Sequence, residues 1–184
     1  ITKLYFNDGS GAFTFSAQPF EAIGGFSSLD LADIDGDGDL DLLVAGQTST
    51  NLYTNDGAGN FTEVIGTPFP GVSNSAIAFA DADNDGDQDV LISGATSLYK
   101  NDGTGIFSID TSSNFPNSGT GDITFSDVNG DNNIDVLISG ITTTESFLYS
   151  NDCYGNFTQV LTTSFIGGGG NGSIDFADVD GDGD

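Results

Sequence analysis

The stretch DIDGDGDLDLLVAG, residues 33–46, joins an acidic ladder to an apolar run, and related ladders recur along the chain. The ladders begin at residues 33, 81, 127 and 178, which are 48, 46 and 51 residues apart. The first three lead into apolar segments, and the fourth, DVDGDGD, occupies residues 178–184. Carboxylates at alternate positions, with glycines that permit tight turns, are what a hard cation needs to gather oxygen ligands from one short loop. The sequence therefore predicts a repeat protein built around calcium-binding loops.

A second motif keeps nearly the same spacing. It reads NDGSGAF from residue 7, NDGAGNF from residue 55, NDGTGIF from residue 101 and NDCYGNF from residue 151. Asp-Gly between two apolar runs is a strong hairpin signal, because glycine readily adopts positive φ. Two unrelated motifs in one phase indicate a structural repeat.

The sequence of each repeat predicts four short strands. No segment places its apolar residues with the period of a helix. In the best-formed unit the strands are residues 28–32, 41–46, 50–55 and 60–64. The equivalents are residues 76–80, 89–94, 97–101 and 106–110, then 122–126, 135–140, 146–151 and 156–160. A period in the forties with four strands per unit predicts an all-β fold, a β-propeller of four-stranded antiparallel blades.

The blades are predicted at residues 25–72, 73–119 and 120–168, with partial blades at 1–24 and 169–184. Residues 1–16 contain only a third and a fourth strand, LYFND and AFTFS, and the last unit contributes one first strand. Because the two ends are out of phase with the blade, we expect a window of a longer propeller or closure against neighbouring chains. The recurring Leu-Tyr pairs and turn phenylalanines are expected to be core, at Leu52, Tyr53, Phe61, Leu98, Tyr99, Phe107, Leu148, Tyr149 and Phe157.

The order of these motifs, from the apolar first strand through the DxDxDGDxD loop to LY and NDGxGxF, resembles the VCBS and FG-GAP class of calcium-binding β-propeller repeats, related to integrin α-subunit heads. The bacterial VCBS-like form is the closer relative, since Phe79-Ala80 and Phe125-Ser126 stand where the name suggests Phe-Gly. The resemblance covers essentially the whole chain. It implies one Ca²⁺ per loop, bound at positions 1, 3, 5, 7 and 9, the seventh through its backbone carbonyl.

Carried over residue by residue, this pattern implies three complete sites and one incomplete site. The complete sites are Asp33, Asp35, Asp37, Asp39 and Asp41; Asp81, Asp83, Asp85, Asp87 and Asp89; and Asp127, Asn129, Asp131, Asn133 and Asp135. The incomplete one is Asp178, Asp180 and Asp182. We expect weaker binding at the third site, because Asn129 replaces a carboxylate with a neutral amide.

Two other calcium loops fit less well. An EF-hand needs a bidentate acid at position 12 between two helices, and those positions are Val44, Ile92 and Ile138. RTX repeats place their glycine-aspartate nonapeptides back to back, whereas these ladders stand nearly fifty residues apart.

Composition is consistent with an extracellular calcium protein. The chain has 28 acidic residues against two basic ones, for a formal charge of −26. Such a chain should repel nucleic acid and anionic membrane surfaces, and no membrane insertion is expected. Cys153 is the single cysteine, so no intramolecular disulfide can form. Sequons begin at Asn60, Asn156 and Asn171. They could carry glycans in a eukaryotic secreted protein, but we favour the interpretation that the recurring NFT reflects β-propensity.

The sequence favours a noncatalytic function. It contains no histidine, and its aspartate clusters are committed to metal. We expect a secreted or cell-surface module that acts in adhesion or recognition of a protein or glycan, or as a structural scaffold. The alternatives are the protomer of an extracellular filament that self-associates through blade edges and, less favoured, part of a propeller-type polysaccharide-active enzyme.

Overall fold

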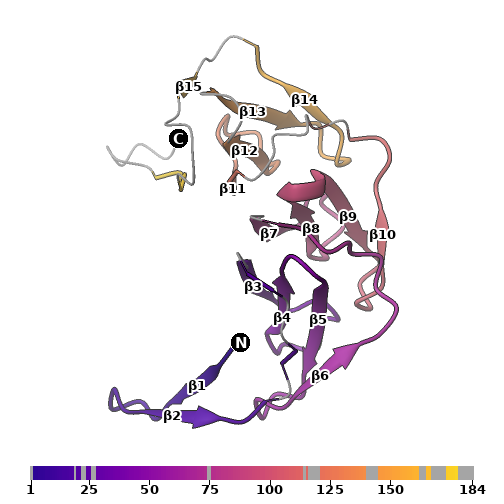
Figure 1. Ribbon diagram of the computed structural model, residues 1–184. Coiled ribbons are helices and arrows are strands. Elements are labelled where there is room, and N and C mark those ends of the chain that lie inside the picture. Colours follow the sequence, from indigo (N-terminus) through magenta and orange to yellow (C-terminus); the bar gives the residue numbers. More distant parts are fainter. Residues whose placement is uncertain are drawn as a thin grey trace.

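The computed structural model describes residues 2–18, 20–21, 24–25, 28–73, 76–113, 115, 121–139, 145–161, 165–166 and 173–177. These residues form four separate antiparallel sheets that follow one another in an open arc (Figure 1). The repeat predicted from the sequence is thus an array of successive sheets, and the all-β propeller-type fold is confirmed.

Each complete sheet is a meander of consecutive strands. The N-terminal hairpin pairs β1 (Leu4–Asn7) with β2 (Phe13–Ser16). The next sheet contains β3 (Ser28–Ala32), β4 (Asp41–Ala45), β5 (Thr50–Asn55) and β6 (Phe61–Val64). It is followed by β7 (Ile77–Ala80), β8 (Asp89–Ile92), β9 (Ser97–Asn101) and β10 (Phe107–Ile109). The last sheet contains β11 (Ile123–Ser126), β12 (Asp135–Ser139), β13 (Glu145–Asn151) and β14 (Phe157–Gln159), with β15 (Phe165–Ile166) also paired to β13.

The first strands of the three full sheets, β3, β7 and β11, lie along the inside of the arc, and β6, β10 and β14 lie toward its outside (Figure 1). The acidic ladders connect the first strand of each sheet to the second. The three described ladders therefore occupy equivalent places in successive sheets.

The core lies between the sheets, because the second strand of each sheet is apolar on both faces. Leu42 and Val44 of β4 pack toward the N-terminal hairpin, and Leu43 of the same strand packs in the cluster shared with β7–β10. The same alternation places Val90 in that shared cluster and Leu91 in the next one. Successive side chains of these strands point to opposite faces, and both faces are buried, so the strands are continuous apolar runs in the sequence.

The predicted core pairs are buried in all three sheets, with Phe61 and Phe157 only partly buried. The sequence analysis did not identify a third aromatic partner, which comes from the linker before each sheet. Phe69 follows β6 and packs edge-on against Tyr99, with ring centroids 5.1 Å apart, and against Phe107 at 5.2 Å. Phe20 and Phe115 make the equivalent contacts in the flanking sheets. Each of these phenylalanines packs its linker against the sheet that follows the linker in the sequence.

Two local expectations were wrong. The strand predicted to run to Gly94 ends at Ile92, and a 3-10 turn, η1 (Ser93–Ala95), follows it, closed by a bond from the Thr96 N–H to the Ser93 carbonyl. Residues 173–177 are not a strand, although a first strand was expected there. They are held to β11–β14 by Asp122, which accepts hydrogen bonds from Ser173 Oγ and the Ile174 N–H. No described strand offers residues 173–177 a backbone ladder.

The inventory of elements also bears on membrane association. Within the described part of the chain, no helix has the length and hydropathy needed to span a bilayer.

Phe69→Ala is expected to lower the free energy of unfolding by about 3 kcal/mol, because it removes a buried ring from two aromatic contacts and leaves a cavity between sheets. The melting temperature should fall by about 10 °C in thermal unfolding followed by circular dichroism. Ile65→Ala is the control: this neighbouring side chain is 82% exposed, so its removal should leave the transition almost unchanged. Equal losses for the two variants would contradict the inter-sheet role of Phe69.

Candidate metal centres

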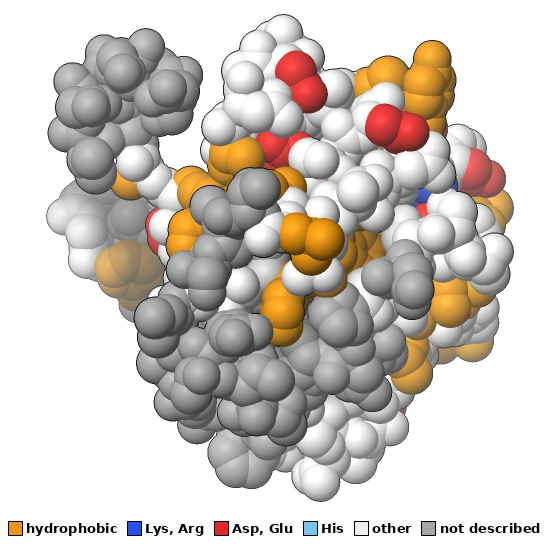
Figure 2. All heavy atoms as spheres, turned by 90° about the horizontal axis from the view of Figure 1, so that it is seen from above, with side chains coloured by type: hydrophobic (Ala, Val, Ile, Leu, Met, Phe, Trp, Pro, Cys, Tyr) orange, Lys and Arg blue, Asp and Glu red, His pale blue; other side chains and the backbone are white. Residues whose placement is uncertain are grey.

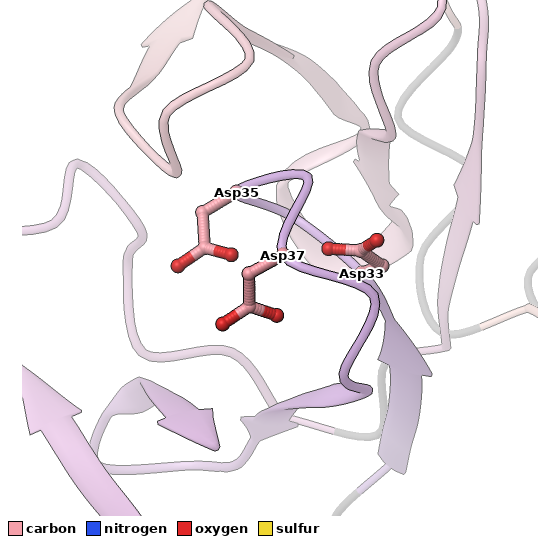
Figure 3. Close-up of side chains that lie close together, drawn as sticks. All are labelled: Asp33, Asp35 and Asp37. Carbon is pink, nitrogen blue, oxygen red and sulfur yellow. The ribbon is translucent and has the colours of Figure 1, made fainter. Parts of the chain in front are cut away.

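The loop between β3 and β4 brings three carboxylates together. Asp33, Asp35 and Asp37 each present an oxygen within 4.8 Å of the others (Figure 3). The loop between β7 and β8 repeats this cluster with Asp81, Asp83 and Asp85. Positions 1, 3 and 5 of two predicted sites thus converge, as a shared cation would require.

The backbone of each loop wraps around the first carboxylate. In the first loop Asp33 accepts hydrogen bonds from the N–H groups of Gly36 and Gly38 at 2.9 and 3.0 Å. Both glycines have positive φ, 76° and 91°, which the tight wrap requires. In the second loop Asp81 accepts from Asp85 and Gly86 at 3.1 Å each. The ladder spacing therefore builds a preformed loop and not an extended acidic segment.

One oxygen in each cluster has no partner. Asp35 Oδ1 and Asp83 Oδ1 are buried and form no hydrogen bond. A buried carboxylate oxygen without a partner is costly, and the cost rises when other carboxylates lie close by. A divalent cation would satisfy these oxygens and neutralise the cluster. The donor set is all oxygen, which suits Ca²⁺ or Mg²⁺ and not a thiolate-preferring metal.

The ninth-position carboxylates form a different kind of contact. Asp41, Asp89 and Asp135 are at most 1% exposed. Asp89 accepts one hydrogen bond from the Ala82 N–H in its own loop and another from the Asn101 N–H on β9. Asp41 and Asp135 accept the equivalent pairs of bonds. These residues anchor the loop to the third strand, and their role as ligands stays a prediction.

Burial has a strong electrostatic effect on this position. It raises the pKa of Asp89 to about 7, against the two backbone hydrogen bonds that lower it, and Asp83 adds to the rise. Burial likewise raises the pKa of Asp41 and of Asp135. In the absence of a cation, the loops therefore resist full ionisation.

The seventh-position side chains lie against the NDG turn that follows. A Cβ added at Gly57 or Gly103 would collide with the carboxylate of Asp39 or Asp87, so these side chains cover the glycine of the following NDG turn. In the third sheet Cys153 replaces that glycine with φ of 70°, and the seventh residue is Asn133. Asn133 Oδ1 instead accepts a hydrogen bond from Asn84 Nδ2 in the preceding loop at 2.9 Å. The role of the position-7 backbone carbonyl as a metal ligand stays a prediction.

The third loop satisfies its own polar groups. Partial burial would raise the pKa of Asp127, but N–H groups of residues 129–132 bond to its carboxylate and lower it. Asn129 Nδ2 donates to Asp135 Oδ2 at 3.3 Å, and Asn129 Oδ1 accepts from the Asp131 N–H at 2.9 Å. None of the buried partnerless oxygens in the described residues belongs to this loop. The fourth predicted site, Asp178, Asp180 and Asp182, lies outside the described residues.

The asparagine of the NDG motif links each of the first two metal loops to the next sheet, a role that the sequence analysis missed. Asn101 Nδ2 donates to the carbonyl of Ile34 in the first loop at 2.7 Å. Asn151 Nδ2 makes the same bond to Ala82 in the second loop, also at 2.7 Å. The signal was the invariance of this asparagine in four copies of the turn, which a hairpin alone does not require.

Lys100 was also missed. Its Nζ donates to Asp83 Oδ2 at 2.9 Å and to the Tyr154 carbonyl at 3.1 Å. The signal was its rarity, since the chain has two basic residues in all. Acidic side chains elsewhere stand in separate patches, and the face in Figure 2 shows very little basic surface.

Comparison with solved structures shows the fold. The chain is similar to a lectin from Agrocybe aegerita described as specifically recognising non-reducing terminal N-acetylglucosamine, with a TM-score of 0.59 and 20% identity over 85% of this chain and 44% of the lectin. It also matches the Tc holotoxin pore of Photorhabdus luminescens, with a TM-score of 0.46 and 20% identity over 88% of this chain and 8% of the toxin chain. The chain thus spans less than half the length of either protein. No curated protein matches significantly.

The family comparison agrees with the repeat seen in both sequence and structure. The model of the FG-GAP-like repeat matches residues 2–44 and again residues 33–92, which include the first two metal loops. The chain is therefore an FG-GAP-type repeat protein.

Proposed function

We propose that this chain is a noncatalytic propeller module that calcium stabilises and that serves extracellular recognition or scaffolding. The observation that carries the proposal is the pair of carboxylate clusters, each with a buried oxygen that has no partner, at Asp35 and Asp83. Each cluster lies in a loop whose backbone carbonyl is bonded to the next sheet. A cation there would stabilise both a loop and a junction between sheets.

Calcium is the cation that best fits this setting. Its coordination shell accepts six to eight oxygens in flexible geometry, whereas Mg²⁺ demands near-octahedral geometry and keeps several waters. Extracellular calcium modules bind the ion at roughly 0.1–1 mM, which matches an environment rich in the ion. The formal charge of −26 makes the folded array costly to maintain without bound cations.

Several features support a noncatalytic role outside the cell. The sequence contains no histidine, and the described aspartates are engaged in loops, turns and strand anchors. FG-GAP repeats are typical of extracellular proteins. The inter-sheet linkers vary among the repeats while the core and the NDG turns recur, which is the pattern of a scaffold that presents variable surfaces to a protein or glycan.

Assembly through blade edges is the second candidate, and the N-terminal hairpin favours it. Tyr5, Phe13 and Phe15 are 49%, 65% and 54% exposed, whereas Tyr53 and Phe107, which occupy matching positions in other sheets, are buried. Another blade or another chain would cover this aromatic surface.

Calcium at about ten times its dissociation constant should stabilise a three-site protein by about 4 kcal/mol and raise the melting temperature by about 10 °C relative to the chelated protein. Asp35→Asn should lose part of that increase, because it replaces the carboxylate that has the partnerless oxygen with the amide found at position 3 of the third loop. Glu21→Gln removes the same charge from an exposed position and should keep the full increase. A melting temperature that chelator does not change would contradict calcium stabilisation.

The metal-free protein should become more stable as the pH falls from 8 to 5. Burial raises the pKa of Asp89, Asp41 and Asp135 above the unfolded value, so the folded chain binds protons more readily. This contribution is complete below about pH 4 and is lost as the pH rises through about 7. In chelator, lowering the pH from 8 to 5 should raise the melting temperature by several degrees. In saturating calcium, the same change of pH should give no such increase. A flat profile in chelator would count against the buried anchors, and Asp89→Asn should flatten it.

The mass and shape of the native particle distinguish recognition from assembly. Sedimentation and electron microscopy with calcium, then after chelation, should show a discrete closed particle if the module serves recognition. A polymer that dissociates on chelation would instead assign the chain to a calcium-dependent structural subunit.

A further inference from the structure

One position in the third strand of each sheet differs sharply between repeats. It lies between the Leu-Tyr pair and the NDG asparagine, and it is Thr54 in β5, Lys100 in β9 and Ser150 in β13. Only the second repeat places a cation there. With two basic residues against 28 acidic ones in the chain, half of the positive side chains stand at this one site.

The Lys100 ammonium lies between a metal loop and the following sheet. It pairs with Asp83 Oδ2 at 2.9 Å, and the two side chains are only 28% and 19% exposed. It also donates to the Tyr154 carbonyl in the NDCYG turn at 3.1 Å. A Cβ at Gly155 would lie 2.8 Å from Nζ, so this turn glycine leaves the space that the ammonium fills.

We infer that Lys100 is a resident cation of the second loop, which stabilises that loop without calcium and weakens its affinity for calcium. The inference rests on the proposed calcium function. It makes the second site different from the first, although the two acidic ladders have the same carboxylates at positions 1, 3 and 5.

The physical argument follows from the two oxygens of Asp83. Oδ1 has no partner and is free for a metal, whereas Oδ2 is bonded to the ammonium. Calcium bound to Oδ1 would lie a few ångströms from a positive charge, and the two cations would repel. If Lys100 withdraws instead, its bonds to Asp83 and Tyr154 are lost. Both routes reduce affinity, and neither arises in the first loop, where the matching residue is Thr54.

A purely structural role for Lys100 makes a different prediction. If the side chain only joined the second and third sheets, its removal would destabilise the metal-free protein and weaken calcium binding together. A resident cation gives changes of opposite sign, because its removal destabilises the metal-free loop but tightens calcium binding.

The test is calcium titration of Lys100→Thr, which installs the residue of the first repeat, followed by NMR. The amides of Gly38, Gly86 and Asn132 report the three loops separately, since each donates to the first carboxylate of its own loop. We expect the Gly86 midpoint to move to about three- to tenfold lower calcium, with the Gly38 midpoint unchanged. In chelator the melting temperature of the variant should be lower than that of the wild type.

Two further variants sharpen the result. Lys3→Thr removes the same charge from an exposed position far along the chain from the loop, and it should leave the Gly86 midpoint in place. Lys100→Arg keeps the charge and should keep the weaker binding. If Lys100→Arg binds as tightly as Lys100→Thr, shape and not charge governs the site, and the inference is wrong.

The remaining outcomes separate the inference from the proposed function. If calcium shifts the amides of all three loops but the Gly86 midpoint is the same in the wild type and in Lys100→Thr, the inference is wrong and the proposed function stands. A Gly86 midpoint at higher calcium in Lys100→Thr than in the wild type also overturns the inference, and it would make Lys100 a structural link between the sheets. No calcium-dependent shift at Gly38, Gly86 or Asn132 overturns the proposed function, and the inference with it.

Discussion

The buried carboxylate at the ninth loop position is the contact on which the array depends. In the first two sheets Asp41 and Asp89 each bind the backbone of their own loop and the backbone of the NDG asparagine. The side chain of Asn101 donates to the carbonyl of Ile34 in the preceding loop, and the N–H of Ile34 donates to Asp41. One hydrogen-bonded path thus runs from Asn55 through the first loop to Asn101 and Asp89. Because all steps but the part-buried Asn55–Asp41 bond are buried, removing one carboxylate would leave several groups without partners.

The sequence predicted the fold well because its two motifs report local chemistry. Asp-Gly turns and alternating carboxylates specify loops directly, and the apolar runs between them leave little choice of strand. What it could not predict are contacts between repeats. From the sequence Phe69 is a linker residue, and only the packed sheets show that it packs edge-on against Tyr99 of the next repeat. The same limit explains why the predicted end of β8 was wrong: the Ser93 hydroxyl accepts a hydrogen bond from the Ala76 N–H, just before β7. Such pairings depend on three-dimensional register and not on local propensity.

The candidate sites were only partly predictable for a related reason. Spacing indicated which side chains converge, and positions 1, 3 and 5 of two loops do converge. Spacing did not indicate which oxygens the protein itself already uses. The ninth carboxylate is engaged by backbone N–H groups, and Asp39 covers the Gly57 turn. The third loop shows the limit most clearly, since Asn129 completes an internal network where its counterparts Asp35 and Asp83 each leave an oxygen without a partner. One ladder pattern therefore encodes loops with different electrostatic needs.

The connection between loops and sheets explains why a repeat protein would use cations for stability. The packing between successive sheets is apolar and nearly identical in each copy, so it provides similar stability at each junction. The copies differ in the loops, through Asp35 and Asn129, and in the third strands, through Thr54, Lys100 and Ser150. Because Asn101 and Asn151 bond to the carbonyls of the preceding loops, the charge state of one loop acts on the sheet that follows it. On the proposals made above, neighbouring junctions would differ in their dependence on calcium while their cores stay alike, and the junction beside Lys100 would depend on the metal less than the junction beside the first loop.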